Sequence, residues 1–449
     1  MTGAPFGFRP ADDDGDGDPD TGADTSAHHQ PVPTGGPGGG PFGLSEEAAG
    51  KIPLFAEISK LLSWQGGPVN WDLARQTALS ALVGTDRPLG SAERLAVVES
   101  LRLADMWLDP VTDLPSGLAH AEAWSRVEWV ERTLPVWSTL CDPVAARVVA
   151  AMGTAVPEEA RSQAGALMGA MSSIGGLMFG AQVGQAIASL AAEVVSSTDI
   201  GLPLAPAGAA VLLPENVAAF GAGLERPDEE VRLFLALREA AHQRLFGAHP
   251  WLRQRLLDTV DAYARGISVD TSAIERAMTE IDPSDPQSMQ RALTGGMFGP
   301  EESPEQRQAL RRLETLLALI EGWVDAVVDD AASGRLPGAG ALRETLRRRR
   351  AAGGPAEQTF ATLVGLELRP RRLRDAAALW QALTRHRGTA GRDAVWAHPD
   401  LLPTADDLDD PERFATETAL SIEGMSTHGP DVDPDAEPNE GPDEGAAGR

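Results

Sequence analysis

Hydrophobic and polar residues alternate with the period of an α-helix along most of the chain. Three helices are clearest, over residues 228–246, 249–266 and 303–332. Asp228 is a typical N-cap for the first helix, which we expect to stop at Gly247, and a Ser–Pro–Glu sequence begins the third. The pattern therefore predicts a mainly α protein with little β structure.

Two segments depart from this amphipathic pattern. The apolar run Ala209–Leu213, bounded by prolines, predicts a short strand. Residues 162–192 carry no charge, and Gly176, Gly180 and Gly184 recur every four residues. That length could span a bilayer, but Gln and Ser interrupt it, and Ala and Gly outnumber Leu and Ile. We therefore expect a helix inside a core, where small residues let backbones approach.

The two ends of the chain differ in composition from the part between them. Residues 1–40 carry seven Asp and one Arg, and residues 404–449 carry fourteen Asp and Glu and two Arg. These tails supply −18 of the net charge of −28, and they have few residues that could form a core. We expect disordered acidic tails over residues 1–46 and 404–449. Between them we expect a helical domain over residues 47–403, with 47–200 as an optional N-terminal subdomain.

The composition indicates the cellular compartment and argues against some kinds of binding site. The single cysteine, Cys141, excludes an intrachain disulfide, and the N-terminal residues lack a basic and apolar signal segment. We therefore expect a cytoplasmic protein that does not bind membranes. Asp12, Asp14 and Asp16 resemble the start of an EF-hand loop, but its twelfth position is Ala23 instead of Glu. A solvated acidic tail is the simpler interpretation.

The helix over residues 228–246 carries polar residues at core-facing positions. Arg238 and His242 lie within about 40° of the apolar stripe that begins at Val231. Glu239 lies beside them, so the run reads Arg-Glu-Ala-Ala-His. This is the zinc motif His-Glu-x-x-His with its first His replaced by Arg. In the intact motif the two His hold zinc, and the Glu is the general base toward the metal-bound water.

At these residues the sequence resembles an actinobacterial zincin-like family, described as zinc-dependent metalloproteases or hydrolases. Some members are linked by name to deazaflavin-coenzyme biosynthesis, a link that no residue here supports. The resemblance covers roughly residues 52–411 and implies a zincin-like fold. The segments that carry it are Trp64–Trp71, Ser197–Pro203, the helix with Glu239 and His242, Pro250–Leu252, Glu321–Gly322 and Val395–Thr404.

The resemblance also assigns roles to residues of the site. Family members with the full motif have His-Glu-x-x-His and, later, Glu-Gly-His. By this match Glu239 is the general base, and His242 and Glu321 are metal ligands. Arg238 stands at the first ligand position, and Trp323 replaces the His after Glu-Gly. A guanidinium cannot ligate zinc, and three protein ligands are usual in catalytic zinc sites.

Two functions follow from this match. In the first, the protein has a degenerate metal site, binds no cofactor and is not an active zinc protease. Arg238 then pairs with Glu239 or Glu321, and the former metal pocket takes a small anion or a peptide. In the alternative, the protein is an active metal-dependent hydrolase. His242, Glu321 and a further ligand such as Glu239 or Asp325 then hold zinc, with Glu239 as general base.

Two other groups of residues could bind ligands. Arginines gather in two runs, but no aromatic residues are interleaved with them, so we expect solvated helix ends or docking of the acidic tails, and no nucleic-acid binding. His398 precedes Pro399 and Asp400, which is typical of a turn, although His398 and His249 remain candidate ligands. The arginines are Arg347, Arg348, Arg349, Arg350, Arg369, Arg371, Arg372 and Arg374.

Overall fold

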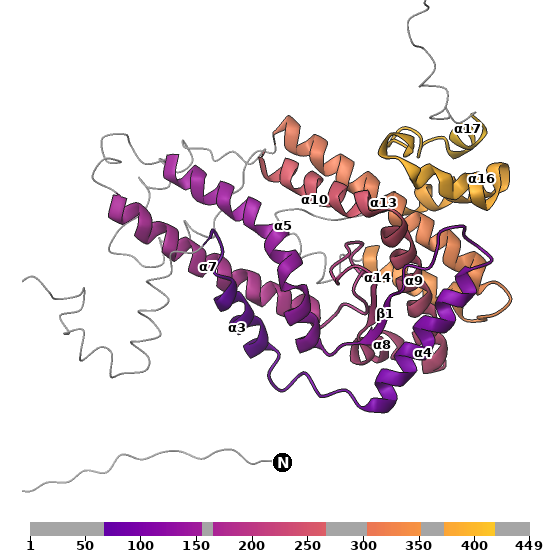
Figure 1. Cartoon of the computed structure of the whole chain (residues 1–449), viewed down its shortest axis with the longest axis horizontal. Helices are drawn as coiled ribbons and strands as arrows, with labels where there is room; N and C mark the ends of the chain where they lie inside the picture. Colours follow the sequence, from indigo (N-terminus) through magenta and orange to yellow (C-terminus); the bar gives the residue numbers. More distant parts are fainter. Residues whose placement is uncertain (1–66, 155–164, 266–302, 352–371, 418–449) are drawn as a thin grey trace, which may run out of the picture. The chain divides into compact units, whose positions relative to one another are not determined.

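The computed structural model describes residues 67–154, 165–265, 303–351 and 372–417 (Figure 1). All of them belong to one compact unit, Lys60–Arg449. Its elements are α3 (Trp71–Ala81), α4 (Ser91–Leu108), β1 (His120–Ala123), α5 (Arg126–Thr154), α7 (Gly165–Ala191), β2 (Ala209–Leu212), α8 (Pro214–Gly221), α9 (Asp228–Ala248), α10 (Pro250–Arg265), α13 (Pro304–Ala332), α14 (Ala339–Ala351), α16 (Leu373–Asp393), η1 (Ala394–Ala397), η2 (Pro399–Leu401) and α17 (Pro411–Thr416). The protein is mainly α with little β structure, as predicted.

Helix α9 is the most deeply buried helix around the candidate site. It packs against α4, α8, α13, α14 and β2, and every residue from Phe234 to Phe246 is buried (Figure 1). Two details differ from the prediction. Pro227 is the N-cap, its carbonyl accepting from the Glu230 N–H, and Asp228 is the first helical residue. The helix continues through Gly247 to Ala248, because Gly does not by itself end a helix that still has packing partners.

Helices α10 and α13 confirm the predicted bounds within the described residues. Ser303 caps α13, and its side chain accepts from the Gln306 N–H at 3.1 Å. Halfway along α13, Gly322 meets α16 at close range. A Cβ added to Gly322 would lie 2.7 Å from the Cβ of Ala376, so α13 and α16 can touch here only through glycine.

Helix α7 confirms the expectation that small residues permit close helix packing. A Cβ on Gly180 would lie 2.5 Å from the Asn70 carbonyl oxygen, and one on Gly184 would lie 2.3 Å from that of Ala74. The Asn70 N–H donates to the carbonyl of Gly176 at 3.0 Å. Within the described residues, no helix has the length and apolar character needed to cross a membrane.

The predicted strand forms one half of a small sheet. β2 pairs in parallel with β1, and Ser196 bridges the other edge of β2 through Leu212 in antiparallel orientation. β1 was not predicted, because its sequence His-Ala-Glu-Ala lacks the β-branched residues that mark strands. Both edges of β2 are therefore covered beside α9.

Packing near two of the predicted domain limits is described by the structure. Helices α4 and α5, from the range 47–200, pack against α9 and α10 within one compact unit. Helix α17, from the range 404–449, packs against α16, and Arg385 pairs with Glu412. The tail 1–46, with the three aspartates of the EF-hand-like sequence, lies outside the described residues.

Candidate functional site

Helix α9 buries three charged or titratable side chains within five positions. Relative exposures are 5% for Arg238, 0% for Glu239 and 2% for His242. Burial of a charge is costly unless the charge is paired and hydrogen-bonded. Each of these side chains must therefore have partners, and the partners show what the site can do.

Arg238 pairs with two carboxylates of α13. Its Nη2 lies 2.5 Å from Oε2 of Glu321, and its Nη1 lies 2.7 Å from Oδ1 of Asp325. Of the two partners expected for Arg238, the structure shows Glu321 and adds Asp325. Glu239 is not its partner. A guanidinium that donates to two carboxylates one helical turn apart bridges α9 to α13.

His242 lies one turn beyond Arg238 and contacts the same carboxylate. Its Nε2 is 3.1 Å from Oε1 of Glu321, and its Nδ1 is 2.8 Å from the carbonyl oxygen of Arg238. Each ring nitrogen therefore faces an oxygen, one of a backbone carbonyl and one of a carboxylate. Phe246 stacks on the ring with 6.4 Å between centroids. Both nitrogens are thus within hydrogen-bond distance of protein oxygens.

Helix α14 supplies two further cations to the same carboxylates. Arg350 donates to both oxygens of Glu321, and Arg347 donates to Oδ2 of Asp325 from Nε at 3.1 Å and from Nη2 at 2.6 Å. These arginines were expected to be solvated helix ends, an expectation that holds for Arg348 but is wrong for Arg347 and Arg350. The helical spacing turns 347 and 350 inward and leaves 348 exposed.

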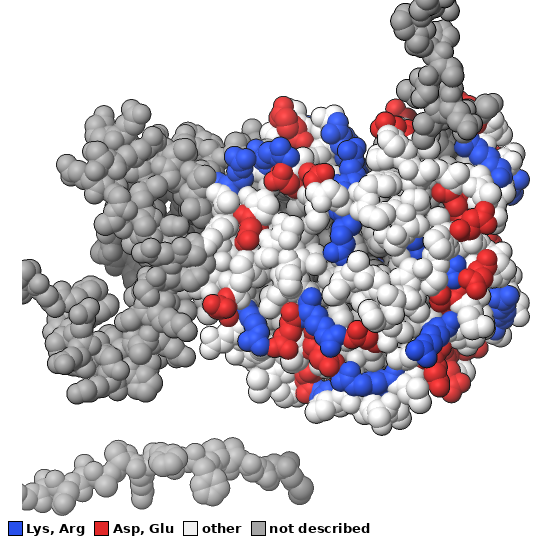
Figure 2. Space-filling model, viewed as in Figure 1, with Lys and Arg blue, Asp and Glu red and all other residues white. Residues whose placement is uncertain are grey.

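The second arginine run partly follows the expectation of docking to acidic tail residues. Arg372 pairs with Asp409, which lies in the predicted C-terminal tail, and also donates to the carbonyl of Ala405. Arg369 and Arg371 lie outside the described residues. Acidic and basic side chains are intermixed on the described part of the face in Figure 2.

The cations control the ionisation of Glu321. Burial alone would raise the pKa of Glu321, but the charges of Arg350, His242 and Arg238 outweigh it and hold that pKa well below its usual range. Burial would likewise lower the pKa of Arg350, and the charge of Glu321 raises it instead. The carboxylate is therefore ionised at neutral pH and is held by two guanidinium groups and by His242.

Glu239 faces a different set of partners. Its Oε1 accepts from Ser197 Oγ at 2.5 Å, from the Val211 N–H at 3.2 Å and from Gln243 Nε2 at 3.0 Å. Its Oε2 accepts from the Thr198 hydroxyl at 2.6 Å and from the Thr198 N–H at 3.2 Å. In the described part of the chain no cationic side chain pairs with it. The structure thus brings Arg238, His242, Glu321 and Asp325 together, and it holds Glu239 apart from them.

Trp323 also faces away from the cluster. Its Nε1 donates to Oδ1 of Asp393 at 2.9 Å. The same carboxylate accepts from Thr112 Oγ1 at 2.6 Å and from Arg392 Nε at 2.8 Å. Sequence reasoning missed Asp393 and Arg392, although they directly precede the Val395–Thr404 segment. The position after Glu321-Gly322 therefore joins α13 to the end of α16.

The other candidate histidines do not join the cluster. His398 caps η2, where its Nδ1 accepts from the Asp400 N–H at 3.2 Å, as expected for a turn. His249 follows α9, and its Nε2 is buried without a hydrogen-bond partner in the described structure. Burial lowers the pKa of His249, which favours the neutral ring. Neither side chain contacts Glu321 or Asp325 among the described interactions.

The donor set does not fit a zinc site. Arg238, at the first ligand position, has no lone pair to donate, and both oxygens of Glu321 accept from guanidinium groups. Within the described residues no group of three or more His, Cys, Asp and Glu side chains could hold a metal ion. Three such ligands are the usual minimum for zinc.

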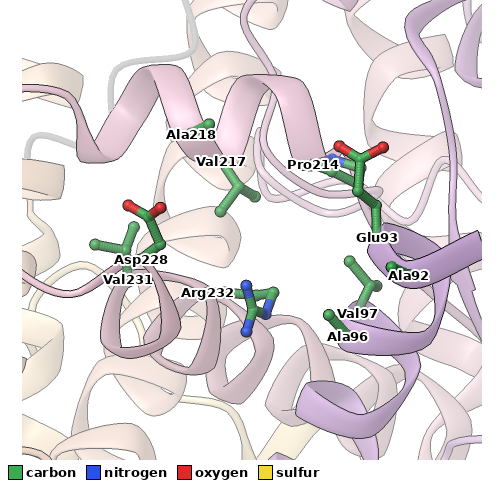
Figure 3. Close-up of a pocket in the computed structure, with 10 residues that line it drawn as sticks. All are labelled: Ala92, Glu93, Ala96, Val97, Pro214, Val217, Ala218, Asp228, Val231 and Arg232. Atoms are coloured by element: carbon green, nitrogen blue, oxygen red, sulfur yellow. The ribbon is translucent and has the colours of Figure 1, made fainter. Parts of the chain in front are cut away.

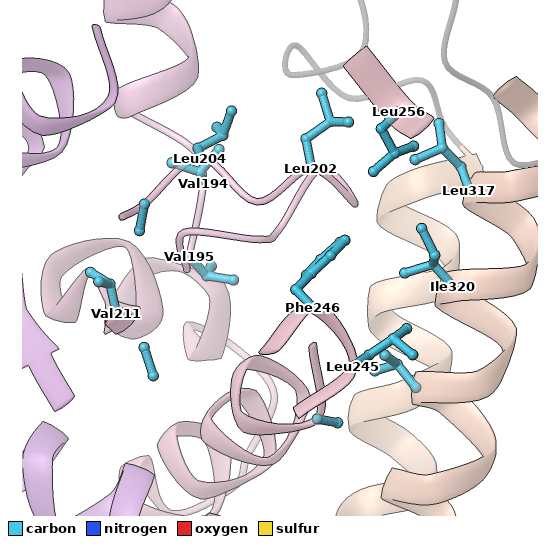
Figure 4. Packing of buried hydrophobic residues seen from close by; sticks show 14 of the residues in the cluster. Val194, Val195, Leu202, Leu204, Val211, Leu245, Phe246, Leu256, Leu317 and Ile320 are labelled. Carbon is cyan, nitrogen blue, oxygen red and sulfur yellow. The ribbon is translucent and has the colours of Figure 1, made fainter. Parts of the chain in front are cut away.

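Apolar side chains surround the cluster on the side of the Leu202 loop. Figure 4 shows Phe246 beneath Leu202, with Leu317 and Ile320 on the neighbouring α13. Leu317 lies one turn before Glu321, and Phe246 lies one turn after His242. These buried residues exclude water from that side, which strengthens the ion pairs.

A pocket of about 320 Å³ lies elsewhere, between α4, α8 and the first turn of α9 (Figure 3). Alanine, valine and proline side chains form most of its wall. Its charged lining residues include Glu93, which pairs with Arg87, and Arg232, which donates to Ser100. None of the predicted site residues lines this pocket.

A family of proteins and a crystal structure are similar to this chain. The family model for zincin-like metallopeptidases matches residues 69–415. A crystal structure from Chloroflexus aurantiacus, provisionally described as a hydrolase with a novel fold, is also similar, with a TM-score of 0.53 and 22% identity. The similarity covers 77% of this chain and 97% of that one, and at this identity it shows the fold alone. No curated protein matches. Because the family model spans most of the chain, this protein belongs to the zincin-like metallopeptidase family.

Proposed function

We propose that this protein is a non-catalytic member of its family and acts as a binding or scaffold protein. The observation that carries the proposal is the bridge from Arg238 to Glu321 and Asp325. Arg238 stands where the family places its first metal ligand. A fixed positive charge there supplies part of the neutralisation that a metal ion would give, so the carboxylates stay buried without a metal.

The contacts of Glu239 support the same proposal. A general base needs a free lone pair directed at a water molecule, within hydrogen-bond distance. Both oxygens of Glu239 are occupied by donors from Ser197, Thr198, Val211 and Gln243. In this arrangement Glu239 fastens α9 to β2 and to the loop before it.

Metal content tests the proposal directly. We expect no stoichiometric zinc in the unmodified full chain purified without a metal-binding tag. Arg238→His restores an imidazole one turn from His242, but Arg350 still occupies Glu321. The double variant Arg238→His/Arg350→Gln should therefore bind more zinc than Arg238→His alone. Inductively coupled plasma mass spectrometry gives the zinc content per chain.

The matched control is Arg238→Gln/Arg350→Gln, which removes the same two charges without adding a ligand. It should bind no zinc. One zinc per chain in the unmodified protein would overturn the proposal and favour the active hydrolase with His242 and Glu321 as ligands. Zinc in the control would show that removal of positive charge, and not a restored ligand, recruits the metal.

The charge of the cluster favours an anion as ligand. Asp199 pairs with both Arg349 and Arg350, so four arginines face three carboxylates: Arg238, Arg347, Arg349 and Arg350 against Glu321, Asp325 and Asp199. The side chains of Arg347 and Arg350 remain 26% and 15% exposed. A small anion or a peptide carboxylate fits this excess of guanidinium groups. Isothermal titration with one tripeptide, either as free acid or as C-terminal amide, tests this. Heat from the free acid alone would support it, and equal heats would contradict it.

A further inference from the structure

Helices α13 and α14 are joined by a ladder of three ion pairs. Carboxylates spaced four residues apart on α13 meet arginines on α14, and the residue numbers rise on one helix as they fall on the other. Such spacing keeps all members of each row on one helical face. The three pairs are Asp329 with Arg343, Asp325 with Arg347, and Glu321 with Arg350.

The ladder runs from solvent into the protein. At the outer pair, the side chains of Arg343 and Asp329 are 28% and 42% exposed. At the inner pair, that of Glu321 is 3% exposed. The inner end of α14 also contacts the loop before β2, where Arg350 Nη2 donates to the Asp199 carbonyl at 2.7 Å. The outer pair is therefore open to screening by salt, and the inner pair closes the cluster.

Apolar contacts of α14 are few in comparison with those of α9. Leu342 and Leu346 are the buried hydrophobic side chains among the described residues of α14. Every residue of α9 from Phe234 to Phe246 is buried. Segments with few buried apolar contacts, here with one exposed charge pair at the outer end, open at lower free energy than the core of a protein.

A glycine with open space around it lies in the connection between the two helices. Gly334 has φ +70°, and no atom lies within 4 Å of a Cβ built there. It follows α13 directly after Ser333 and precedes α14 by a few residues. Glycine adopts either sign of φ at little cost, so changes of backbone angle can be absorbed at this position.

We propose that α14 is a lid over Glu321 and Asp325, fastened by the ion-pair ladder and hinged at Gly334. It opens as a unit while α9 and α13 stay folded. Opening returns Arg347 and Arg350 to water, so hydration offsets much of the lost attraction. The open form exposes Glu321 and Asp325, still bridged by Arg238, together with His242. The lid is independent of whether the site is catalytic.

Salt-dependent hydrogen exchange of the full chain tests the lid. Amides of residues 339–351 should exchange roughly fivefold or more faster in 1 M than in 0.05 M NaCl, because the Debye length falls to about 3 Å. Amides of α9 and of the middle of α13 should change less than about twofold. If α14 and α13 accelerate together, or if α14 is insensitive to salt, the proposal is overturned.

A charge exchange at the outer pair separates the ladder from other effects of salt. Arg343→Glu places two negative charges opposite each other and should accelerate α14 exchange at low salt. Arg343→Glu/Asp329→Arg restores the pair in reverse and should return exchange to the level of the unmodified protein. Arg348→Gln is the matched control, because Arg348 pairs within α14 with Glu344 and takes no part in the ladder. Failure of the reversed pair to slow exchange would contradict the proposal.

Discussion

Two buried carboxylates near the middle of the molecule are stabilised in opposite ways. Glu239 on α9 accepts from hydroxyl, amide and backbone donors that carry no charge. Glu321 on α13 is held by the cations Arg238 and Arg350 and by His242. Both are almost fully buried, at 0% and 2% exposure. Burial removes the water that would solvate each carboxylate. Guanidinium groups replace that water at Glu321, and neutral hydrogen-bond donors replace it at Glu239.

The comparison shows how two carboxylates at predicted site positions are satisfied where Arg238 stands at the predicted first-ligand position. Glu321, at the predicted third-ligand position, would be a costly buried charge without partners, and Arg238, Arg350 and His242 surround it. Glu239, at the predicted general-base position, instead accepts five hydrogen bonds from uncharged donors. Removing either carboxylate should therefore destabilise the protein for a different reason and by a different amount.

The largest effect is expected from Glu321→Gln. It leaves Arg238 and Arg350 buried without their shared counter-ion, which should lower the free energy of unfolding by roughly 3–5 kcal/mol. Denaturant unfolding of the full chain measures this loss. Glu305→Gln, exposed on the same helix, is the control and should change stability by less than about 0.5 kcal/mol. Equal losses in the two variants would show that the cations are satisfied without Glu321.

Glu239→Gln should have an intermediate effect. The amide keeps the shape, but its NH₂ group would face donors where an oxygen now accepts from them. Loss of two hydrogen bonds and the donors left unpaired should lower stability by about 2 kcal/mol. The same unfolding measurement applies. A loss larger than that of Glu321→Gln would reverse the comparison and mark Glu239 as the more tightly bound charge.

Acid should weaken the Glu321 cluster. The pKa of Glu321 in the folded protein lies well below the ordinary value of 4.5 because of the cations around it. Its stabilisation is therefore complete above the unfolded pKa and is lost as pH falls from about 4.3 toward the folded pKa. Unfolding free energies at several pH values should fall through this range in the unmodified protein. In Glu321→Gln the decline should be shallower, and an identical slope would contradict the assignment.

The smallest effect is expected from Ser197→Ala. The substitution removes one neutral donor from Glu239, while the other four remain. The expected loss is about 1 kcal/mol, because the carboxylate keeps most of its hydrogen bonds. Ser189→Ala, at a half-buried serine on α7 whose hydroxyl donates to the Gln185 carbonyl of the same helix, provides a comparison with little expected change. A loss near that of Glu239→Gln would indicate that the Ser197 hydroxyl contributes most of the binding of the carboxylate.

Local signals in the sequence predicted much of the fold. The caps and apolar stripes of α10 and α13 are formed by residues of each segment itself, so the bounds of both helices could be predicted from the sequence. β1 was missed because its stability comes from its partner β2 and not from its own residues. The site was predicted in part. Arg238, His242, Glu321 and Asp325 do meet, but the inward turn of Arg347 and Arg350 depends on how α14 packs on α13, and no local pattern encodes that.

The partners of Glu239 also could not be predicted, because they lie far from it in the sequence. The Ser197–Pro203 segment was recognised as one that the family shares, but its link to Glu239 spans about forty residues and a strand. Hydroxyl groups in a loop have too many candidate partners for sequence to select one. Asp393 was missed for the same reason, because its donors come from Thr112, Trp323 and Arg392.

The contact of Gly322 with Ala376 requires that this position of α13, without a side chain, faces α16. A Cβ at position 322 would lie 2.7 Å from the Cβ of Ala376, so any side chain there would have to displace α16. Residues 321 and 323 flank this contact and point about 200° apart, one toward the cations and one toward Asp393. A single hydrogen atom in place of a methyl group thus sets the angular position of two polar networks at once. Any substitution at position 322 would therefore disturb the Glu321 cluster and the Asp393 network together.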